Sequence, residues 1–328
     1  MDTHELVANT ARDKPEHAAE WSVGHGKIIL LGEHSVVYGR HAVAAPLPFA
    51  IRALASDGAN GIALSIPGWG VERRIPARAP QQQPAQDVVA RLLRLITERL
   101  GLTGQDLRIR VDAGIPRGMG VGGSAALAVA IIRALGRHRG LQLSDEQVCA
   151  LAFECEKIAH GTPSGIDNTV ATYGHALLYR AGTPPEIERI VLDRPPPLVL
   201  GLCHHPGLTV ETVAKVRRAW TEQCALHERV FDAMDAIALA GLNALRGHDW
   251  KRLGALMNMC QGQLESLGVS SDELDDMIRI ARRHGAVGAK LTGGGGGGAM
   301  IALCPDGREP VIEALSGAGY DALEIRLR

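Results

Sequence analysis

Four segments of the sequence combine residue types that could act on a phosphate group. In chain order they are G-K-I-I-L-L-G-E-H at 26–34, P-R-G-M-G-V-G-G-S-A-A at 116–126, E-K-I-A-H-G-T-P-S-G-I-D-N at 156–168, and K-L-T-G-G-G-G-G-G-A-M at 290–300. Glycine-rich loops can bring backbone N–H groups close to a phosphate, and lysine and carboxylates can move protons or hold a cation. The chemistry to be tested is therefore phosphate binding or transfer.

The glycine run at 116–126 matches G-x-G-x-x-G at Gly118, Gly120 and Gly123. A dinucleotide-binding fold would need a parallel strand after the next helix, but a second capped helix follows instead. A Walker A loop is excluded because no G-K-S/T follows the glycines. What remains is a helix beginning at Ser124, whose unpaired N–H groups favour an anion. A simple tight turn between strand and helix is the alternative interpretation.

The other segments each allow an ordinary interpretation beside the functional one. Six glycines usually form a flexible linker, yet both flanks of this run are apolar and strand-like, which indicates close approach of backbones. Glu156 lies near a predicted helix end, where a carboxylate is usually solvated. Asp167 follows T-P-S-G, where a turn-forming Asp is common. Lys27 opens an apolar strand, a less usual place for a lysine.

The predicted elements that must position these segments mix strands and helices without regular alternation, so we expect an α+β protein. Strands are predicted at 22–31, beyond the Gly39 turn and at 107–111, and helices at 88–100 after an Asp87 cap, at 124–138, and from a capping box at 144–147. A loop is predicted at 76–86. Helices at 210–245, 250–267 and 272–284, a strand pair at 288–303 and a last helix and strand follow. We expect a polar lead-in at 1–21 and domains at 22–195 and 196–328.

The composition narrows the class of protein. The 328 residues carry 35 Lys and Arg against 36 Asp and Glu, a net charge of −1, whereas nucleic-acid and membrane-surface proteins normally have a basic excess. Neither partner is therefore expected. The six cysteines form no C-x-x-C pair, which argues against a zinc ribbon. With no secretory signal and no run of 18 apolar residues, the sequence predicts a cytoplasmic protein.

Together the four segments resemble the motifs of the GHMP kinases, in the same order, over roughly residues 22–328. The strings E-H-S-V-V-Y-G at 33–39 and H-G-T-P-S-G-I-D-N at 160–168 are similar to the mevalonate branch of that family. The resemblance implies a two-domain fold, with an N-terminal domain like that of ribosomal protein S5 and a C-terminal ferredoxin-like domain. It also implies ATP-dependent phosphorylation of the C5 hydroxyl of mevalonate. A related kinase for phosphomevalonate or another hydroxyl acceptor, or a non-catalytic sensor, is the alternative.

The resemblance also implies roles for individual residues. Asp167 is the expected catalytic carboxylate, with Lys27 as its partner near the same hydroxyl. Ser124 and Glu156 are the expected ligands of Mg²⁺, which accompanies ATP. The expected ATP-phosphate loop comprises Gly118, Gly120, Gly122, Gly123, Ser124 and Ala125. The expected acceptor residues are Lys27, Glu33, His34, Thr209 and Gly295. ATP and mevalonate are the expected partners, and a homodimer is the candidate assembly.

Two positions depart from the family pattern. The phosphate loop commonly reads G-L-G-S-S-A-A, whereas Val121 and Gly123 replace its leucine and first serine here; Ser124 is kept. An arginine often found two positions before Thr209 is Gly207, so the sequence leaves open how the acceptor's carboxylate is held.

Overall fold

The computed structural model describes residues 20–76, 88–207 and 209–327, and these form two compact units. Unit 1 contains residues 20–26, 49–117 and 123–173, and unit 2 contains 27–48, 118–122 and the chain from 174 onward. Each unit is therefore assembled from segments that alternate along the sequence. The sequence suggested a single boundary near residue 195, and that boundary stays a prediction. Most of the predicted lead-in and of the loop at 76–86, together with the Asp87 cap, lies outside the described residues.

The strands of unit 1 form a sheet in the order β4-β3-β5-β2, where β2 contributes its second half. Their bounds are β2 His41–Asp57, β3 Ile62–Ile66, β4 Val71–Ile75 and β5 Leu107–Ala113. Strands β3 and β5 are parallel, and the other neighbouring pairs are antiparallel. Along β5 the apolar residues are buried and the arginines between them are exposed, as the alternating sequence predicted.

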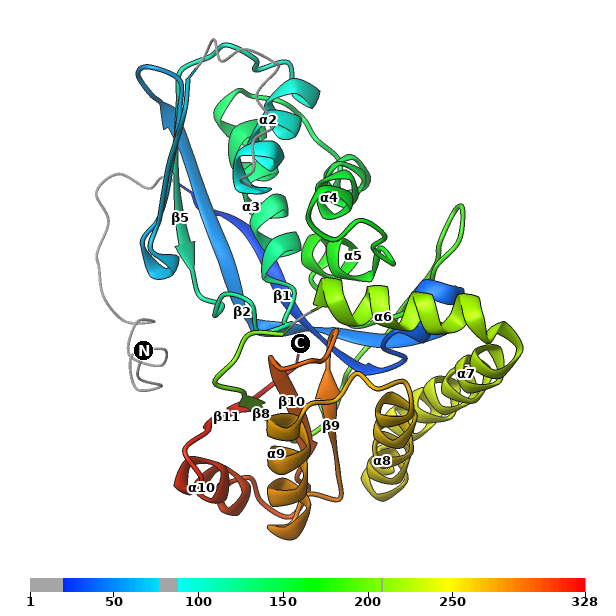
Figure 1. Ribbon diagram of the computed structural model, residues 1–328. Coiled ribbons are helices and arrows are strands. Elements are labelled where there is room, and N and C mark those ends of the chain that lie inside the picture. The colour runs from blue at the N-terminus through cyan, green and yellow to red at the C-terminus, as the bar shows by residue number, and fades with distance from the viewer. Residues whose placement is uncertain (1–19, 77–87, 208, 328) are drawn as a thin grey trace. The chain divides into compact units, whose positions relative to one another are not determined.

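Helices cover one face of this sheet in unit 1 (Figure 1). They are α2 Val88–Arg99, α3 Gly123–His138, α4 Asp145–His160 and α5 Ile166–Tyr173. Helix α3 packs closely against β1 (Ser22–Leu31), since a Cβ atom on Gly24 of that strand would lie 2.1 Å from the Ala126 carbonyl oxygen. The predicted capping box is confirmed, since Ser144 and Gln147 exchange hydrogen bonds at the start of α4.

Unit 2 contains an antiparallel sheet in the order β11-β8-β10-β9. Its strands are β8 Leu198–Leu202, β9 Gly288–Thr292, β10 Ala299–Leu303 and β11 Asp321–Ile325. Helices connect β8 to β9, and α10 (Glu309–Gly317) connects β10 to β11. This is the split βαβ arrangement of a ferredoxin-like domain, which confirms that expectation.

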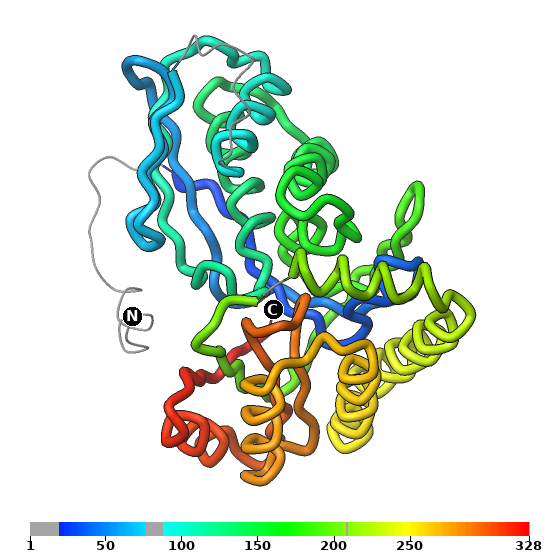
Figure 2. The backbone as a smooth tube through the Cα atoms, in the orientation of Figure 1, coloured from blue at the N-terminus to red at the C-terminus, as the bar shows by residue number. Residues whose placement is uncertain are grey.

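Four helices separate β8 from β9 in unit 2: α6 Thr209–Glu222, α7 Cys224–Arg246, α8 Trp250–Ser266 and α9 Asp272–Arg283. The sequence predicted one helical run over 210–245, but α6 ends at Glu222 and α7 begins at Cys224. The chain changes direction between these two helices (Figure 2). Helices α8 and α9 pack against β9, so they cover the strand that leads into the six glycines.

The remaining strands of unit 2 are residues 27–31 of β1 and the first half of β2, together with β6 (Leu177–Arg180) and β7 (Glu186–Arg189). A short 3-10 helix, η1 (Ser35–Tyr38), precedes β2, which begins beyond the Gly39 turn as predicted; another, η2 (Pro67–Trp69), lies in unit 1. Within the part of the chain that the structure describes, no helix is both long enough and apolar enough to cross a bilayer.

Candidate active site

Ser124 and Glu156 meet at one nitrogen atom in unit 1. The Oγ atom of Ser124 lies 3.1 Å from the Nε2 atom of His160, and Oε2 of Glu156 lies 3.7 Å from the same Nε2. Ser124 belongs to the first turn of α3, whereas Glu156 and His160 are one turn apart at the end of α4. The packing of α3 against α4 brings these ends together, as joint action on a metal would require.

The donors of this cluster suit a magnesium ion. Glu156 is only 2% exposed, so its carboxylate is not the solvated helix-end group that is usual at such a position. Mg²⁺ prefers hard oxygen ligands and takes few of them from protein when it also binds phosphates. Among residues 20–76, 88–207 and 209–327, no group of three or more His, Cys, Asp or Glu side chains could hold a metal ion. A hydroxyl and one carboxylate therefore fit an ion that also binds phosphate oxygens.

Asp167 lies in the first turn of α5 and is half-buried. The sequence allowed a simple turn here, but Asp167 belongs to a helix, and the backbone N–H of Ile166 donates to Ser164 Oγ at 3.3 Å just before it. A carboxylate in the first turn is stabilised by the helix dipole. Asn168 donates to the Cys149 carbonyl at 3.2 Å, which fastens α5 to α4.

Lys27 lies along the glycine loop at 118–122 in unit 2. Its Nζ donates to the Gly120 carbonyl at 3.2 Å and its backbone N–H donates to the Val121 carbonyl at 2.9 Å. Gly118, Gly120 and Gly122 have φ angles of 79°, 70° and 78°, which favour glycine. A Cβ atom at Gly122 would also lie 2.8 Å from Lys27 Cγ. The loop therefore closes around this lysine, and directly beyond it Gly123, Ser124 and Ala125 open α3.

The six glycines at 293–298 join β9 to β10 as a packed turn in unit 2. A Cβ atom on Gly293 would lie 2.5 Å from the Gly120 carbonyl oxygen, and one on Gly295 would lie 2.1 Å from the Val269 carbonyl oxygen. A flexible linker would show no such contacts. The prediction of close backbone approach is therefore confirmed, and one of the approached backbones is the glycine loop itself.

His34 and Thr209, two of the residues expected to bind the acceptor substrate, lie next to Gly294 in unit 2. The His34 ring donates from Nε2 to the Gly294 carbonyl at 3.0 Å, and a Cβ atom on Gly294 would lie 2.6 Å from Thr209 Oγ1. Burial lowers the pKa of His34 to about 4, so the imidazole is neutral near pH 7. A neutral ring with Nε2–H committed to a carbonyl offers no positive charge to a carboxylate.

Glu33 differs from the other expected acceptor residues because its carboxylate faces another side chain of the protein. Glu33 and Lys290 are both 0% exposed and form an ion pair, and the Cys260 thiol lies 3.9 Å from Glu33 Oε2. Burial raises the pKa of Glu33, and Lys290 opposes that effect. Neither Lys290 nor His160 was predicted from the sequence to have a role, although both lie in the four glycine-rich and acidic segments. His160 could have been found from the sequence, because it follows Glu156 by four positions and therefore lies on the same face of the predicted helix.

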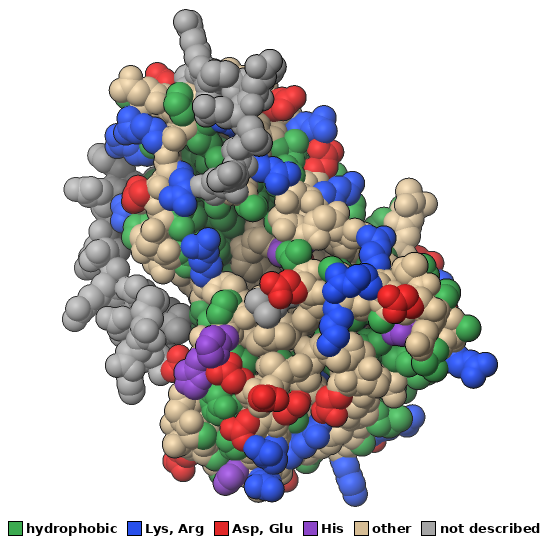
Figure 3. Space-filling model, viewed as in Figure 1, with side chains coloured by type: hydrophobic (Ala, Val, Ile, Leu, Met, Phe, Trp, Pro, Cys, Tyr) green, Lys and Arg blue, Asp and Glu red, His purple; other side chains and the backbone are tan. Residues whose placement is uncertain are grey.

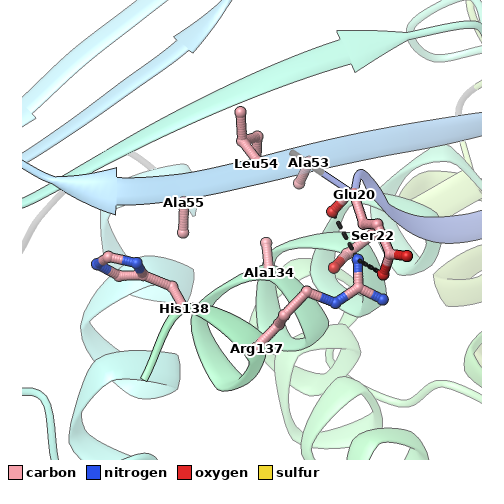
Figure 4. Close-up of a pocket in the computed structure, with 8 residues that line it drawn as sticks. All are labelled: Glu20, Ser22, Ala53, Leu54, Ala55, Ala134, Arg137 and His138. Carbon is pink, nitrogen blue, oxygen red and sulfur yellow. Dashed lines mark hydrogen bonds and ion pairs between the residues drawn. The ribbon is translucent and has the colours of Figure 1, made fainter. Parts of the chain in front are cut away.

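A cavity of about 140 Å³ lies between β2 and α3 in unit 1, away from these residues (Figure 4). Small side chains at Ala53, Ala55 and Ala134 leave the space, and Arg137 donates to the Glu20 carbonyl at its edge. It contains none of the predicted site residues. On the face drawn in Figure 3, basic and acidic side chains are interspersed. The cavity and this surface therefore add no group to the candidate site.

Comparison with family models identifies both halves of the chain. Residues 87–175 match the model described as "GHMP kinases N terminal domain", and residues 238–321 match "GHMP kinases C terminal". These ranges include Ser124, Glu156, Asp167 and the six glycines. The chain therefore belongs to the GHMP kinase family.

Individual relatives show which members of the family the chain resembles. A mevalonate kinase of Thermococcus onnurineus is 35% identical over 309 residues, covering 89% of this chain and 91% of the relative. One of Aeropyrum pernix is 36% identical over 310 residues, covering 89% and 92%. A crystal structure of L. major mevalonate kinase in complex with R-mevalonate has a TM-score of 0.80 and 29% identity, covering 97% of this chain and 99% of that one. Over nearly its whole length, the chain is similar to mevalonate kinases.

Proposed function

We propose that this protein transfers the γ-phosphoryl group of ATP to the C5 hydroxyl of mevalonate, giving 5-phosphomevalonate and ADP. The observation that carries the proposal is the meeting of Ser124 and Glu156 at His160 Nε2. Phosphoryl transfer depends chiefly on positioning and on neutralising charge. The family membership and the relatives named mevalonate kinase support the choice of reaction and acceptor.

The nucleotide side of the reaction uses the glycine loop and the start of α3. Backbone N–H groups at Gly123, Ser124 and Ala125 open α3 and favour the phosphates of ATP. Ser124 and Glu156 would hold Mg²⁺, which when bound neutralises charge on the β- and γ-phosphates. The Lys27 ammonium, fixed on the Gly120 carbonyl, adds a positive charge at the loop.

The acceptor side depends on removing one proton from the C5 hydroxyl. Asp167 accepts this proton as the hydroxyl oxygen bonds to phosphorus and the bond to the ADP oxygen breaks. Its place on a helix that Asn168 fastens to α4 supports this role, because proton transfer requires a positioned side chain. Lys27 keeps the role near the same hydroxyl that the resemblance to the family gives it.

Phosphomevalonate is the closest competing acceptor, and the charges near His34 disfavour it. The phosphate group of phosphomevalonate carries about two negative charges, and proteins usually bind such a group with Lys or Arg. Lys290 is fully buried and paired with Glu33, and His34 is neutral near pH 7. The Thr209 hydroxyl and backbone N–H groups are suited to a single carboxylate. A non-catalytic sensor is disfavoured because Asp167 and Lys27 are both present.

A coupled ADP-release assay tests the proposal by offering mevalonate, phosphomevalonate, homoserine and galactose separately. We expect kcat/KM for mevalonate to exceed that for phosphomevalonate at least tenfold, which is a difference of about 1.4 kcal/mol. Equal or better turnover of phosphomevalonate would overturn the choice of acceptor while leaving the kinase family intact. The cytoplasmic location and the homodimer stay predictions.

A further inference from the structure

The backbone at His34 adopts a conformation that residues other than glycine rarely take. His34 has φ 60° and ψ −51°, and the Ser35 N–H donates to the Glu33 carbonyl at 2.6 Å. A hydrogen bond between residues i and i+2 around a central residue with positive φ defines the strained form of the γ-turn. Such strain persists only where the surroundings over-determine it, and it concentrates at functional sites.

Each of the three residues of this turn makes a hydrogen bond or ion pair through its side chain. Glu33 is paired with Lys290, the His34 ring donates to the Gly294 carbonyl, and Ser35 Oγ donates to the Gly32 carbonyl at 3.2 Å. Glu33, Ser35 and Lys290 are all 0% exposed, and His34 is 6% exposed. Side chains therefore hold the turn from both sides of the strained residue.

Lys290 occupies a position that explains its burial. It is the middle residue of β9, the strand that leads into the turn containing Gly294, and it also donates to the Leu291 carbonyl at 2.6 Å. The Lys290 ion pair fixes Glu33 at the first position of the γ-turn, and the same strand leads to the carbonyl that receives the His34 ring. Strand β9 and the turn after it thus fix both the backbone conformation and the ring position of His34.

We propose that Lys290 and Glu33 form a positioning pair that holds the strained turn at His34, and that Glu33 acts on the acceptor through this pair rather than by contact. The role of this pair depends on the proposed function only in experiments that measure binding of mevalonate. It assigns a role to Lys290 and replaces direct contact as the role of Glu33. Without the pair, the turn relaxes and the His34 ring leaves Gly294.

Three variants separate this role from the alternatives: Glu33→Gln, Lys290→Met and the double variant. Each single variant leaves one buried charge without its partner, whereas the double variant leaves none, so it should regain most of the unfolding free energy. We expect all three to raise KM for mevalonate at least tenfold, by similar factors, with KM for ATP changed less than threefold. The double change should therefore be non-additive in KM. The matched control removes the exposed pair of Arg246 and Glu188 by Arg246→Met, which should leave both KM values unchanged.

Two results in KM would overturn the proposal. A double variant with the KM of the unaltered protein would show that the pair only stabilises the fold. An increase in Glu33→Gln alone, with Lys290→Met unchanged, would show that Glu33 contacts the acceptor directly. If both single variants fail to unfold cooperatively, the double variant carries the test, and its failure to gain stability over them would show that the two side chains are not coupled.

A measurement without acceptor distinguishes failure of this proposal from failure of the proposed function. Nitrogen-15 NMR of the His34 ring reports whether the proton stays on Nε2, where Gly294 holds it. We expect that tautomer in the unaltered protein and a mixture of tautomers in the double variant. An unchanged His34 signal in the double variant would overturn the positioning role, whichever acceptor the enzyme uses.

Discussion

The Nε2 atom of His160 lies 3.1 Å from the Oγ atom of Ser124, although the two residues are 36 positions apart. The same nitrogen is 3.7 Å from Glu156, so one imidazole contacts both expected magnesium ligands. Residues that orient metal ligands without binding the metal commonly set its affinity. His160 is therefore placed to orient the hydroxyl and the carboxylate before nucleotide binds.

His160→Ala should raise the Mg²⁺ concentration for half-maximal rate by about tenfold, since loss of such an orienting partner costs about 10- to 100-fold. Ser124→Ala and Glu156→Gln, which remove the proposed ligands themselves, should raise it at least as much. The measurement is initial rate against free Mg²⁺, together with binding of Mn²⁺ and ATP followed by electron paramagnetic resonance. Glu154→Gln, on the same helix but in an exposed pair with Arg99, is the control. A normal Mg²⁺ dependence in all three variants would remove this cluster from the metal site.

Asp167→Asn should lower kcat by about 10²- to 10⁴-fold, because it removes the proposed proton acceptor while keeping the shape of the side chain. KM for ATP should change little. Steady-state kinetics with mevalonate as acceptor give both constants, and a thermal melt checks that α5 still folds. Asp112→Asn, in an exposed ion pair of unit 1, is the control. More than about a tenth of the original kcat in Asp167→Asn would exclude general-base catalysis by this residue.

The folded protein should lose stability between about pH 6.5 and pH 4 through His34. Its pKa is lowered to about 4 when folded, chiefly by burial, whereas an unfolded histidine titrates near 6.5. In this window the unfolded chain binds a proton that the folded chain lacks, so the contribution of His34 is complete above pH 6.5 and lost as pH falls, to a total of about 3 kcal/mol.

Urea unfolding at several pH values measures this effect by comparing the unaltered protein with His34→Gln. Glu33 and Lys290 form their buried ion pair close to His34, and both residues are retained in the two proteins. The variant should show a shallower loss of stability on acidification. Parallel curves would mean that His34 is not the group that takes up the proton.

Gly294→Ala should raise KM for mevalonate, because the new Cβ would lie 2.6 Å from Thr209 Oγ1 and must displace that side chain. The matched control is Gly207→Ala, where the three atoms nearest to a Cβ would be the carbonyl oxygens of Gly295, Gly297 and Gly118 at 3.5–3.6 Å. Kinetics with varied mevalonate and varied ATP distinguish the two substrates. Equal KM values for mevalonate in the two variants would contradict a role for Thr209 beside Gly294.

Local patterns in the sequence were sufficient to predict helices and strands near the candidate site. The 3.6-residue period from Val88 to Leu100 matches α2, and the alternation in 107–111 matches β5. Strand β2 was harder to predict because it contains Pro46 and Pro48. These two residues lie between its pairings with β6 at 41–44 and with β5 at 51–57, where they interrupt neither of those ladders.

The sequence by itself indicated phosphate binding or transfer through the glycine loop before Ser124 and the acidic residues in 156–168, and the order of its four motifs indicated the kinase family. The tertiary structure alone decided what each charged group faces. Glu33 and Lys290 are 257 positions apart and form a fully buried ion pair, and Ser124 and Glu156 both contact the His160 ring. No local period encodes such contacts, because they arise when packed elements exclude water and a buried charge must find a partner.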